Sequence, residues 1–180
     1  MRKNFIIAGL LLASVALLGA CSGNDHNAGD VTFAQQMIPH HSQALDMAKL
    51  VPSRSTNTKV LDLASRIEKA QDPEIRQMRS WLTAWGAGMP GMTQEPMPGM
   101  SGSMPGMMSD ADLKQLQAAK GAEFDKMWLD MMIKHHQGAI DMAKTELTKG
   151  GNADAKALAQ KIIDAQQTEI TEMQGLLKQS

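Results

Sequence analysis

Imidazole and thioether side chains recur at the same spacing in two parts of the chain. The two sets consist of Met37, His40, His41 and Met47, and of Met132, His135, His136 and Met142. Thioethers and imidazoles together form a soft-to-borderline ligand set that suits Cu(I) and Ag(I), and Cu(II) when more nitrogen is present. On a helix, a methionine three or four residues before a histidine can share one ion with it. Met47 lies about 10 Å further along such a helix than His40, so it belongs to another layer.

The same residues also have a structural interpretation. Methionine at helical spacing commonly fills a core because its side chain is flexible, and a single histidine on an apolar face is commonly satisfied by a hydrogen bond. Two adjacent pairs at equivalent positions hold four of the five histidines of the chain, which favours metal binding for the imidazoles. For the methionines, core packing and metal binding both remain open.

Further polar and sulfur side chains are expected to face the same core. Helical periodicity places them on the inner stripe of a second helix in each set, and they are Gln71, Glu74 and Met78, and Gln166, Glu169 and Met173. We expect the amides and carboxylates to be partners of the histidines rather than direct ligands, because buried polar groups need partners. The two additional methionines are either ligands or core filler.

The two sets belong to an internal repeat with a constant offset of 95 residues. The segment 33–49 matches 128–144, and the match continues without a gap as far as Met78 and Met173. Because the register never slips, each repeat must contain the same pair of elements joined by a loop of the same length.

Each repeat is predicted to form a helical hairpin. Capping residues and helix breakers place helices at about 30–50 (ended by Pro52) and 59–85, and at 109–149 (interrupted near Gly121) and 152–178. No segment has the pattern of a strand, so the fold class is all-α: a four-helix bundle built from two repeated helical hairpins. The long connection between the repeats allows the first helices of the two hairpins to run parallel or antiparallel. That choice decides whether the histidine pairs form one shared site or two.

A segment of different composition, 86–109, separates the repeats. Pro-Gly-Met occurs three times in it, and proline and glycine at this density prevent a helix. It nevertheless contains seven methionines: Met89, Met92, Met97, Met100, Met104, Met107 and Met108. A flexible run of thioethers can wrap a soft cation, and a methionine-rich surface can also dock a partner protein. We favour metal binding for this loop.

The N-terminus has the features of an export signal. Residues 1–20 combine a short basic start with an apolar run at 5–18 that is too short for a comfortable membrane span. The sequence Leu18-Gly19-Ala20-Cys21 resembles the lipobox of bacterial lipoproteins, in which the cysteine is lipidated and begins the mature chain. We therefore expect Cys21 to anchor the protein at the cell envelope, in the periplasm or on the outer surface, through a flexible tether over 21–30. The repeats 31–85 and 110–180 then form one domain.

Composition excludes several function classes. The chain has 180 residues and a formal net charge of −1, so it lacks the basic surface of a nucleic-acid-binding protein. Its single cysteine excludes an intrachain disulfide and an all-cysteine zinc site. A di-iron oxidase needs a Glu-x-x-His motif, but methionine occupies the position three residues before His40 and His135. We therefore expect no enzyme activity.

Two longer motifs resemble a known family. The segments 37–48 (Met-Ile-Pro-His-His-Ser-Gln-Ala-Leu-Asp-Met-Ala) and 132–143 (Met-Ile-Lys-His-His-Gln-Gly-Ala-Ile-Asp-Met-Ala) closely resemble the signature of family 305 among the domains of unknown function. The pattern Ala-Gln-x-x-Glu-Ile-x-x-Met at 70–78 and 165–173 resembles the second motif of that family, so the resemblance covers 33–178.

This resemblance implies a ferritin-like four-helix fold in a bacterial protein that is secreted or lipid-anchored. Some members of the family are periplasmic copper-binding proteins that use methionine and histidine, which implies ligand roles for the two sets described first. Lys134 and Ser42 stand where the family usually has proline and glutamine, so the two sites need not be equivalent.

The leading hypothesis is an envelope-anchored lipoprotein that binds copper through methionine and histidine, for buffering, resistance or delivery. Cu(I) is the favoured ion, with Cu(II) and Ag(I) as further candidates. A copper-donating or copper-accepting envelope protein is the expected partner. The alternative is a helical envelope lipoprotein that binds a partner protein and no metal.

Overall fold

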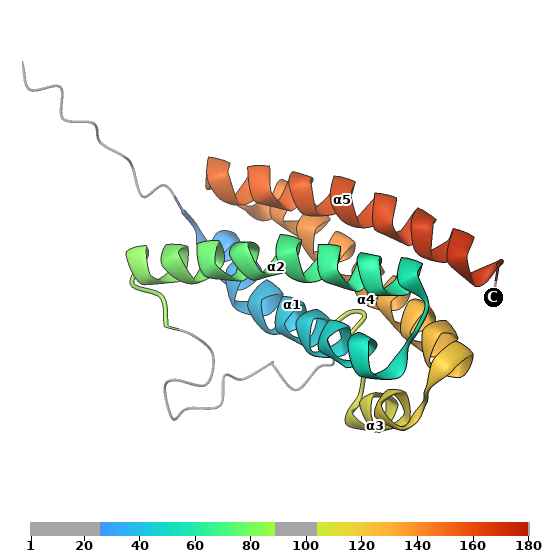
Figure 1. The fold of residues 1–180 in the computed structure, drawn as a ribbon. Helices are drawn as coiled ribbons and strands as arrows, with labels where there is room; N and C mark the ends of the chain where they lie inside the picture. The colour runs from blue at the N-terminus through green and yellow to red at the C-terminus, as the bar shows by residue number, and fades with distance from the viewer. Residues whose placement is uncertain (1–25, 89–103, 180) are drawn as a thin grey trace, which may run out of the picture.

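The computed structural model describes residues 26–88 and 104–179. The described residues form five α-helices and no strand: α1 (Ala28–Arg54), α2 (Thr58–Ala84), α3 (Asp110–Ala118), α4 (Gly121–Lys149) and α5 (Ala153–Leu177). Figure 1 shows α1, α2, α4 and α5 as a four-helix bundle, with the short α3 against α4. The predicted all-α bundle of two hairpins is therefore confirmed. Within the described ranges, no helix combines the length and apolar character that a bilayer span requires.

The first helix begins earlier than predicted. Asn27 caps it, because its side-chain oxygen accepts hydrogen bonds from the amides of Gly29 (2.6 Å) and Asp30 (3.3 Å). The Asp30 side chain returns the interaction by accepting from the amide of Asn27, which completes a capping box. The prediction of a flexible tether as far as residue 30 is therefore wrong for its last three residues.

Prolines do not end the helices in which they lie. α1 continues past Pro52 to Arg54, although Pro52 was expected to end it. A proline in the last turn removes only one helical hydrogen bond, and the buried side chain of Val51 holds this turn against the core. Pro39 and Pro73 likewise lie inside α1 and α2. Tertiary packing therefore outweighs the local cost of these prolines.

The second repeat begins with an additional short helix. Ser109 and Asp112 form the predicted capping box at the start of α3. This helix ends at Ala118, and α4 begins at Gly121, whose φ of 59° is readily adopted only by glycine. The interruption expected at Gly121 thus separates two helices instead of bending one. Asn152 caps α5 as predicted.

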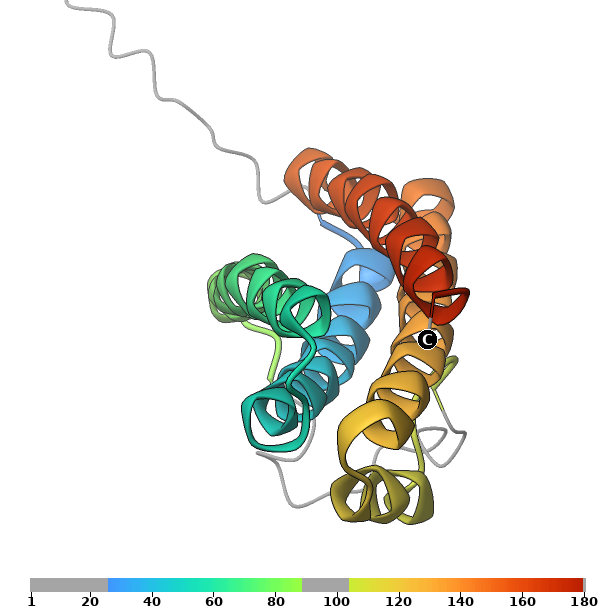
Figure 2. The same ribbon diagram turned by 45° about the vertical axis from the view of Figure 1, so that its right-hand side comes forward.

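α1 and α4 form the main contact between the two repeats, and they run antiparallel. In the second half of α1, the backbone carbonyl of Met47 accepts a hydrogen bond from the indole of Trp128, early in α4 (3.1 Å). At the start of α1, the side chain of Asn27 donates to the carbonyl of Lys149 at the end of α4 (3.0 Å). Figure 2 shows α1 and α4 side by side, with α2 packed on α1 and α5 packed on α4.

The apolar core consists of two clusters, one toward each end of the bundle. Methionines from both repeats belong to each cluster: Met47, Met131, Met132 and Met173 to the first, and Met37, Met78 and Met142 to the second. In α1, α2 and α5, a short polar stretch separates the residues of the first cluster from those of the second, and in α4 Ile140 is the one residue of the first cluster that lies beyond its polar stretch. The core is therefore divided across its middle.

A pair of carboxyl groups joins the start of α1 to the turn between α4 and α5. The Asp30 carboxylate accepts hydrogen bonds from the backbone amides of Gly151 (3.0 Å) and Asn152 (2.9 Å). Glu146 lies beside it, and a Cβ atom on Gly150 would overlap with the Glu146 carboxyl group, which explains the glycine at this position. Burial and the neighbouring Asp30 raise the pKa of Glu146 to about 8, so Glu146 is protonated at neutral pH and donates to Asp30.

The raised pKa of Glu146 predicts that the stability of the fold depends on pH. The folded state keeps this proton up to about pH 8, while the unfolded chain releases it near pH 4.5, so the free energy of unfolding falls as pH rises through this interval. Glu146→Gln cannot ionise, and we expect a smaller decline in this variant. Urea denaturation at several pH values in this interval gives the free energy of unfolding of the unchanged protein and of Glu146→Gln. Glu123→Gln, at an exposed position, is the control. An equal decline in Glu146→Gln and the unchanged protein would contradict the raised pKa.

Candidate metal centre

The polar stretches of the four long helices meet across the middle of the core. Each helix contributes two side chains, and together they form the polar layer: His40, His41, Gln71, Glu74, His135, His136, Gln166 and Glu169. All four imidazoles are completely buried, and the other members are buried or nearly so. Because apolar clusters lie on both sides, electrostatic interactions within the polar layer are stronger than they would be in water.

His40 of α1 and His135 of α4 face each other at the centre of the polar layer. Their ring centroids are 3.8 Å apart, and the rings are tilted by 39°. These residues occupy equivalent positions in the two repeats, so the pseudo-two-fold relation between the hairpins passes between them. The antiparallel arrangement of α1 and α4 therefore brings the two histidine pairs to one level, a point that the sequence left open.

The second histidine of each pair is bonded to a carboxylate of its own hairpin. His41 donates through Nε2 to Glu74 (3.0 Å), and His136 donates through Nε2 to Glu169 (2.7 Å). A carboxylate behind an imidazole fixes the orientation and the tautomer of the ring and leaves Nδ1 deprotonated. Burial alone would raise the pKa of Glu74, but the bonds from His41 and from Lys161 (3.2 Å) keep it below its ordinary value.

His40 and His135 lack such carboxylate partners. Nε2 of His40 donates to the backbone carbonyl of Pro105 (3.0 Å), in the segment that precedes α3. Burial, reinforced by the neighbouring His41, lowers the pKa of His40 to about 3. Burial also lowers the pKa of His135, a shift that the backbone of His40 opposes only weakly. Neither ring nitrogen of His135 makes a hydrogen bond of normal geometry in the described part of the chain. Both facing rings are therefore neutral, which removes the repulsion that two cations would experience.

Several polar atoms of the polar layer are buried without a partner among the described residues. They are Nδ1 of His40, His41 and His136, both ring nitrogens of His135, both amide atoms of Gln71 and Oε1 of Gln166. An unsatisfied buried polar atom costs about 1–3 kcal/mol, and folded proteins rarely contain several together. The free imidazole nitrogens carry lone pairs, and a metal ion would satisfy them.

The imidazoles do not form a complete metal cage by themselves. Within the described ranges, no three His, Cys, Asp or Glu side chains are arranged to hold one ion. Thioethers are available on both sides of the polar layer, from the seven buried methionines of the two apolar clusters. The burial of these methionines fits core packing as well as ligation. Imidazoles and thioethers together would form a donor set that suits a soft ion.

The described end of the methionine-rich loop packs over the polar layer. The side-chain amide of Gln43 donates to the carbonyl of Met108 (2.9 Å) and accepts from the Met108 backbone amide (2.8 Å). Met104 and Met107 are half-buried nearby in the chain, while Met89, Met92, Met97 and Met100 lie outside the described residues, as does Cys21. Sequence patterns did not indicate Gln43. The one available signal is that the second repeat has Gly138 at the equivalent position.

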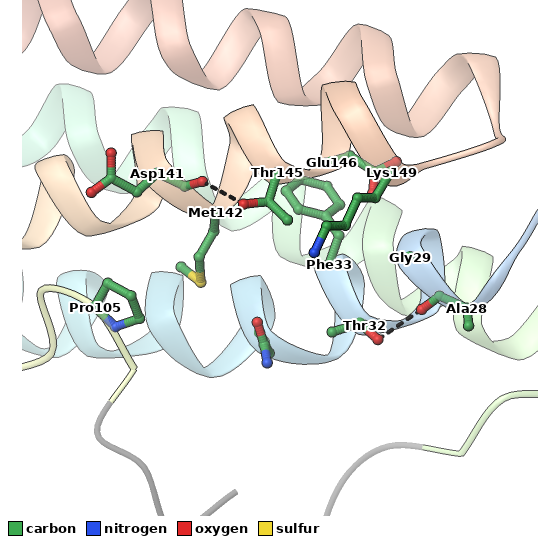
Figure 3. Close-up of a pocket in the computed structure, with 11 residues that line it drawn as sticks. Ala28, Gly29, Thr32, Phe33, Pro105, Asp141, Met142, Thr145, Glu146 and Lys149 are labelled. Carbon is green, nitrogen blue, oxygen red and sulfur yellow. Dashed lines mark hydrogen bonds between the residues drawn. The ribbon is translucent and has the colours of Figure 1, made fainter. Parts of the chain in front are cut away.

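An open cavity of about 470 Å³ lies between the first half of α1 and the second half of α4. Figure 3 shows the Met142 side chain pointing between these helices into the cavity, with Pro105 at one end. Phe33 and Glu146 line it further along. Because Met142 also belongs to the second apolar cluster, the cavity brings solvent close to a thioether of the core.

Comparisons with known proteins agree with this architecture. The chain matches the family model of the domain of unknown function DUF305 over residues 30–177. A DUF305 protein from Streptomyces coelicolor, named as secreted, is 33% identical with a TM-score of 0.76 over 84% of this chain and 93% of that one. A DUF305 fragment from Deinococcus radiodurans is also 33% identical, with a TM-score of 0.76 over 87% of this chain and 99% of the fragment.

A third structural neighbour, CopM, is a metal-bound protein. Its Cu(II)-bound form is 30% identical, with a TM-score of 0.70 over 83% of this chain and 96% of that one, and it is also known in Cu(I)-bound, Ag-bound and apo forms. Among curated sequences, an uncharacterized protein of Acanthamoeba polyphaga mimivirus is 42% identical over 53 residues, which are 29% of this chain and 35% of that protein. The family model covers most of the chain, and the solved structures share its helical fold. This chain therefore belongs to the DUF305 family.

Proposed function

We propose that the protein binds copper, with Cu(I) as the favoured ion, through the imidazoles of the polar layer and the methionines beside it. The observation that carries this proposal is the group of unpartnered ring nitrogens in the buried core. Neutral imidazole and thioether donors together favour soft ions. CopM, which has the same fold, has been solved with Cu(II), Cu(I) and Ag.

The central ligands in this proposal are His40 and His135, which lie close enough to bind one ion between the repeats after small rotations of their rings. His41 and His136 offer Nδ1, since Nε2 of each ring is held by a carboxylate. Six methionines of the two clusters complete the set: Met37, Met47, Met78, Met132, Met142 and Met173. Met37 and Met132 lie one helical turn before the central histidines. Flexible thioether side chains can adjust their positions to the ion.

The proposed role is binding of a cargo ion rather than catalysis. Di-iron chemistry requires carboxylates that bridge two metal ions, whereas the two carboxylates of the polar layer are engaged by His41 and His136. A buried site that holds copper away from water suits buffering, resistance or delivery to a copper-accepting protein. An anchor at Cys21 would keep this function at the cell envelope, and the secreted DUF305 relative supports an exported chain.

A Cu(I) titration tests the proposed site. The protein is titrated under reducing, anaerobic conditions against a competing chelator, with zinc and iron(II) in parallel. We expect tight binding of Cu(I) that His40→Ala and His135→Ala each weaken by more than about tenfold, the scale of loss seen even for groups that only orient metal ligands. His26→Ala, outside the bundle core, is the control. Unchanged affinity in both variants, or a preference for zinc or iron, would contradict the proposal and favour a partner-binding protein.

A second pair of variants separates ligation by sulfur from packing. Met132→Leu keeps the volume of a fully buried side chain but removes its thioether, so the fold should tolerate it. Met131→Leu makes the same change at the neighbouring buried position, which was not predicted to bind metal. We expect Met132→Leu alone to weaken Cu(I) binding. If both variants bind Cu(I) equally well, Met132 is core filler.

The hydrogen bonds of the polar layer predict the histidine tautomers of the metal-free protein. His40, His41 and His136 each donate through Nε2, so each should carry its proton there and leave Nδ1 free. Long-range ¹H–¹⁵N NMR spectra at neutral pH distinguish the two tautomers. Addition of Cu(I) should then shift Nδ1 more than Nε2. Protonation at Nδ1 in these rings would remove the proposed donor atoms.

The lipid anchor is tested by Cys21→Ser. The variant lacks the thiol that receives the lipid, so we expect it to incorporate no labelled fatty acid and to leave the membrane fraction. Ser22→Ala, one residue further along, should behave as the unchanged protein. Continued sedimentation of Cys21→Ser with membranes would show that the anchor lies elsewhere.

A further inference from the structure

The residues 104–108, which we name the strap, are attached to α1 at two points, one at His40 in the polar layer and one at Gln43 beside it. Pro105 accepts a hydrogen bond from His40 through its backbone carbonyl (3.0 Å). The Gln43 side chain holds Met108 by two hydrogen bonds: it donates to the Met108 backbone carbonyl (2.9 Å) and accepts from the Met108 backbone amide (2.8 Å). The strap therefore covers the Nε2 edge of a central histidine and is attached to the same helix one turn further on.

The strap also needs space on the surface of α4 that a side chain would otherwise fill. Gly138 provides it, because a Cβ atom at this position would overlap with the carbonyl group of Pro105. Gly106 then turns the chain over α4 with a φ of 77°, a conformation that favours glycine. Its own Cβ position would meet the backbone of Lys134 and Gly138. The two glycines thus allow backbone to approach backbone beside the histidine pair.

Gln43 and Gly138 occupy equivalent positions of the two repeats and have complementary tasks. On α1, a long amide side chain reaches out and binds the strap. On α4, the absence of a side chain makes room for it. This departure from internal symmetry lets the strap lie on the polar layer in one orientation.

Pro105 contacts both the His40 ring and the open cavity. It lines one end of that cavity (Figure 3), and its backbone carbonyl accepts a hydrogen bond from His40. The attachments of the strap are few and its side chains are half-exposed, in contrast to the buried helices on which it lies. Segments with few contacts open locally without unfolding the rest of a protein. An opened strap would connect His40 to the cavity beside Met142.

We propose that Gln43 and Gly138 are positioning residues that hold the strap on His40 and thereby set the rate at which a metal ion enters and leaves the histidine pair. This inference rests on the proposed copper binding for its metal readout. The strap itself is a property of the metal-free chain, so it can be tested without the metal.

The test compares Gln43→Ala with Gln35→Ala. Gln35 also binds loop backbone through its amide, at Gly88 (2.7 Å), but away from the polar layer. Modification of metal-free protein with diethyl pyrocarbonate, read by mass spectrometry, reports the exposure of His40, with His26 as internal reference. Because two hydrogen bonds are lost, we expect His40 to react about tenfold faster or more in Gln43→Ala, and at the original rate in Gln35→Ala.

Gly138→Ala provides an independent variant. Alanine favours the helix more than glycine does, so α4 should stay folded while the strap is displaced. We expect faster amide hydrogen exchange at Met108 and faster release of Cu(I) to excess chelator in both Gly138→Ala and Gln43→Ala, with a smaller change in affinity. Unchanged His40 reactivity and unchanged release in both variants would overturn the proposal. If the unchanged protein binds no Cu(I), the proposed function fails, while the reactivity of His40 still decides the role of the strap.

Discussion

The burial of four imidazoles in the middle of an apolar core is the constraint around which this bundle is organised. Desolvation disfavours charge on these rings, and burial accordingly lowers the pKa of His40, His135 and His136. Neutral rings still need partners for their N–H groups. Two carboxylates and one backbone carbonyl supply them for three of the four rings. Each long helix must therefore present apolar residues toward both ends and polar residues at its centre.

Internal duplication provides this arrangement because one hairpin pattern is used twice. One hairpin that carries a histidine pair and a carboxylate exposes polar groups on its inner face. A second copy, turned end for end, covers that face with the same pattern. The equivalent bonds of His41 to Glu74 and of His136 to Glu169 show that both copies use one geometry. The shared centre at His40 and His135 exists only when the copies are combined.

The polar layer is made asymmetric by some of the positions at which the copies differ. Gln43 and Gly138 admit and hold the end of the loop that joins the repeats. Glu74 has a lysine partner as well as its histidine. The carboxyl pair of Asp30 and Glu146 fixes the start of the first repeat to the turn within the second. The residues shared by both repeats thus form the polar layer itself. Residues that differ between the repeats place the strap over one side of it.

The sequence by itself determined the helices, the repeat and the family, and it showed which side-chain types could bind metal, because capping, helical periodicity and side-chain type are local properties. It did not determine where α1 begins or that Pro52 lies within it, since long-range packing outweighed local propensity at both points. Only the tertiary structure decided that α1 and α4 are antiparallel. The central histidines are 95 residues apart in the chain, and no local pattern sets the distance between them. The mixing of methionines from both repeats and the contact of Pro105 with His40 follow from that same packing, so they too became visible only in three dimensions.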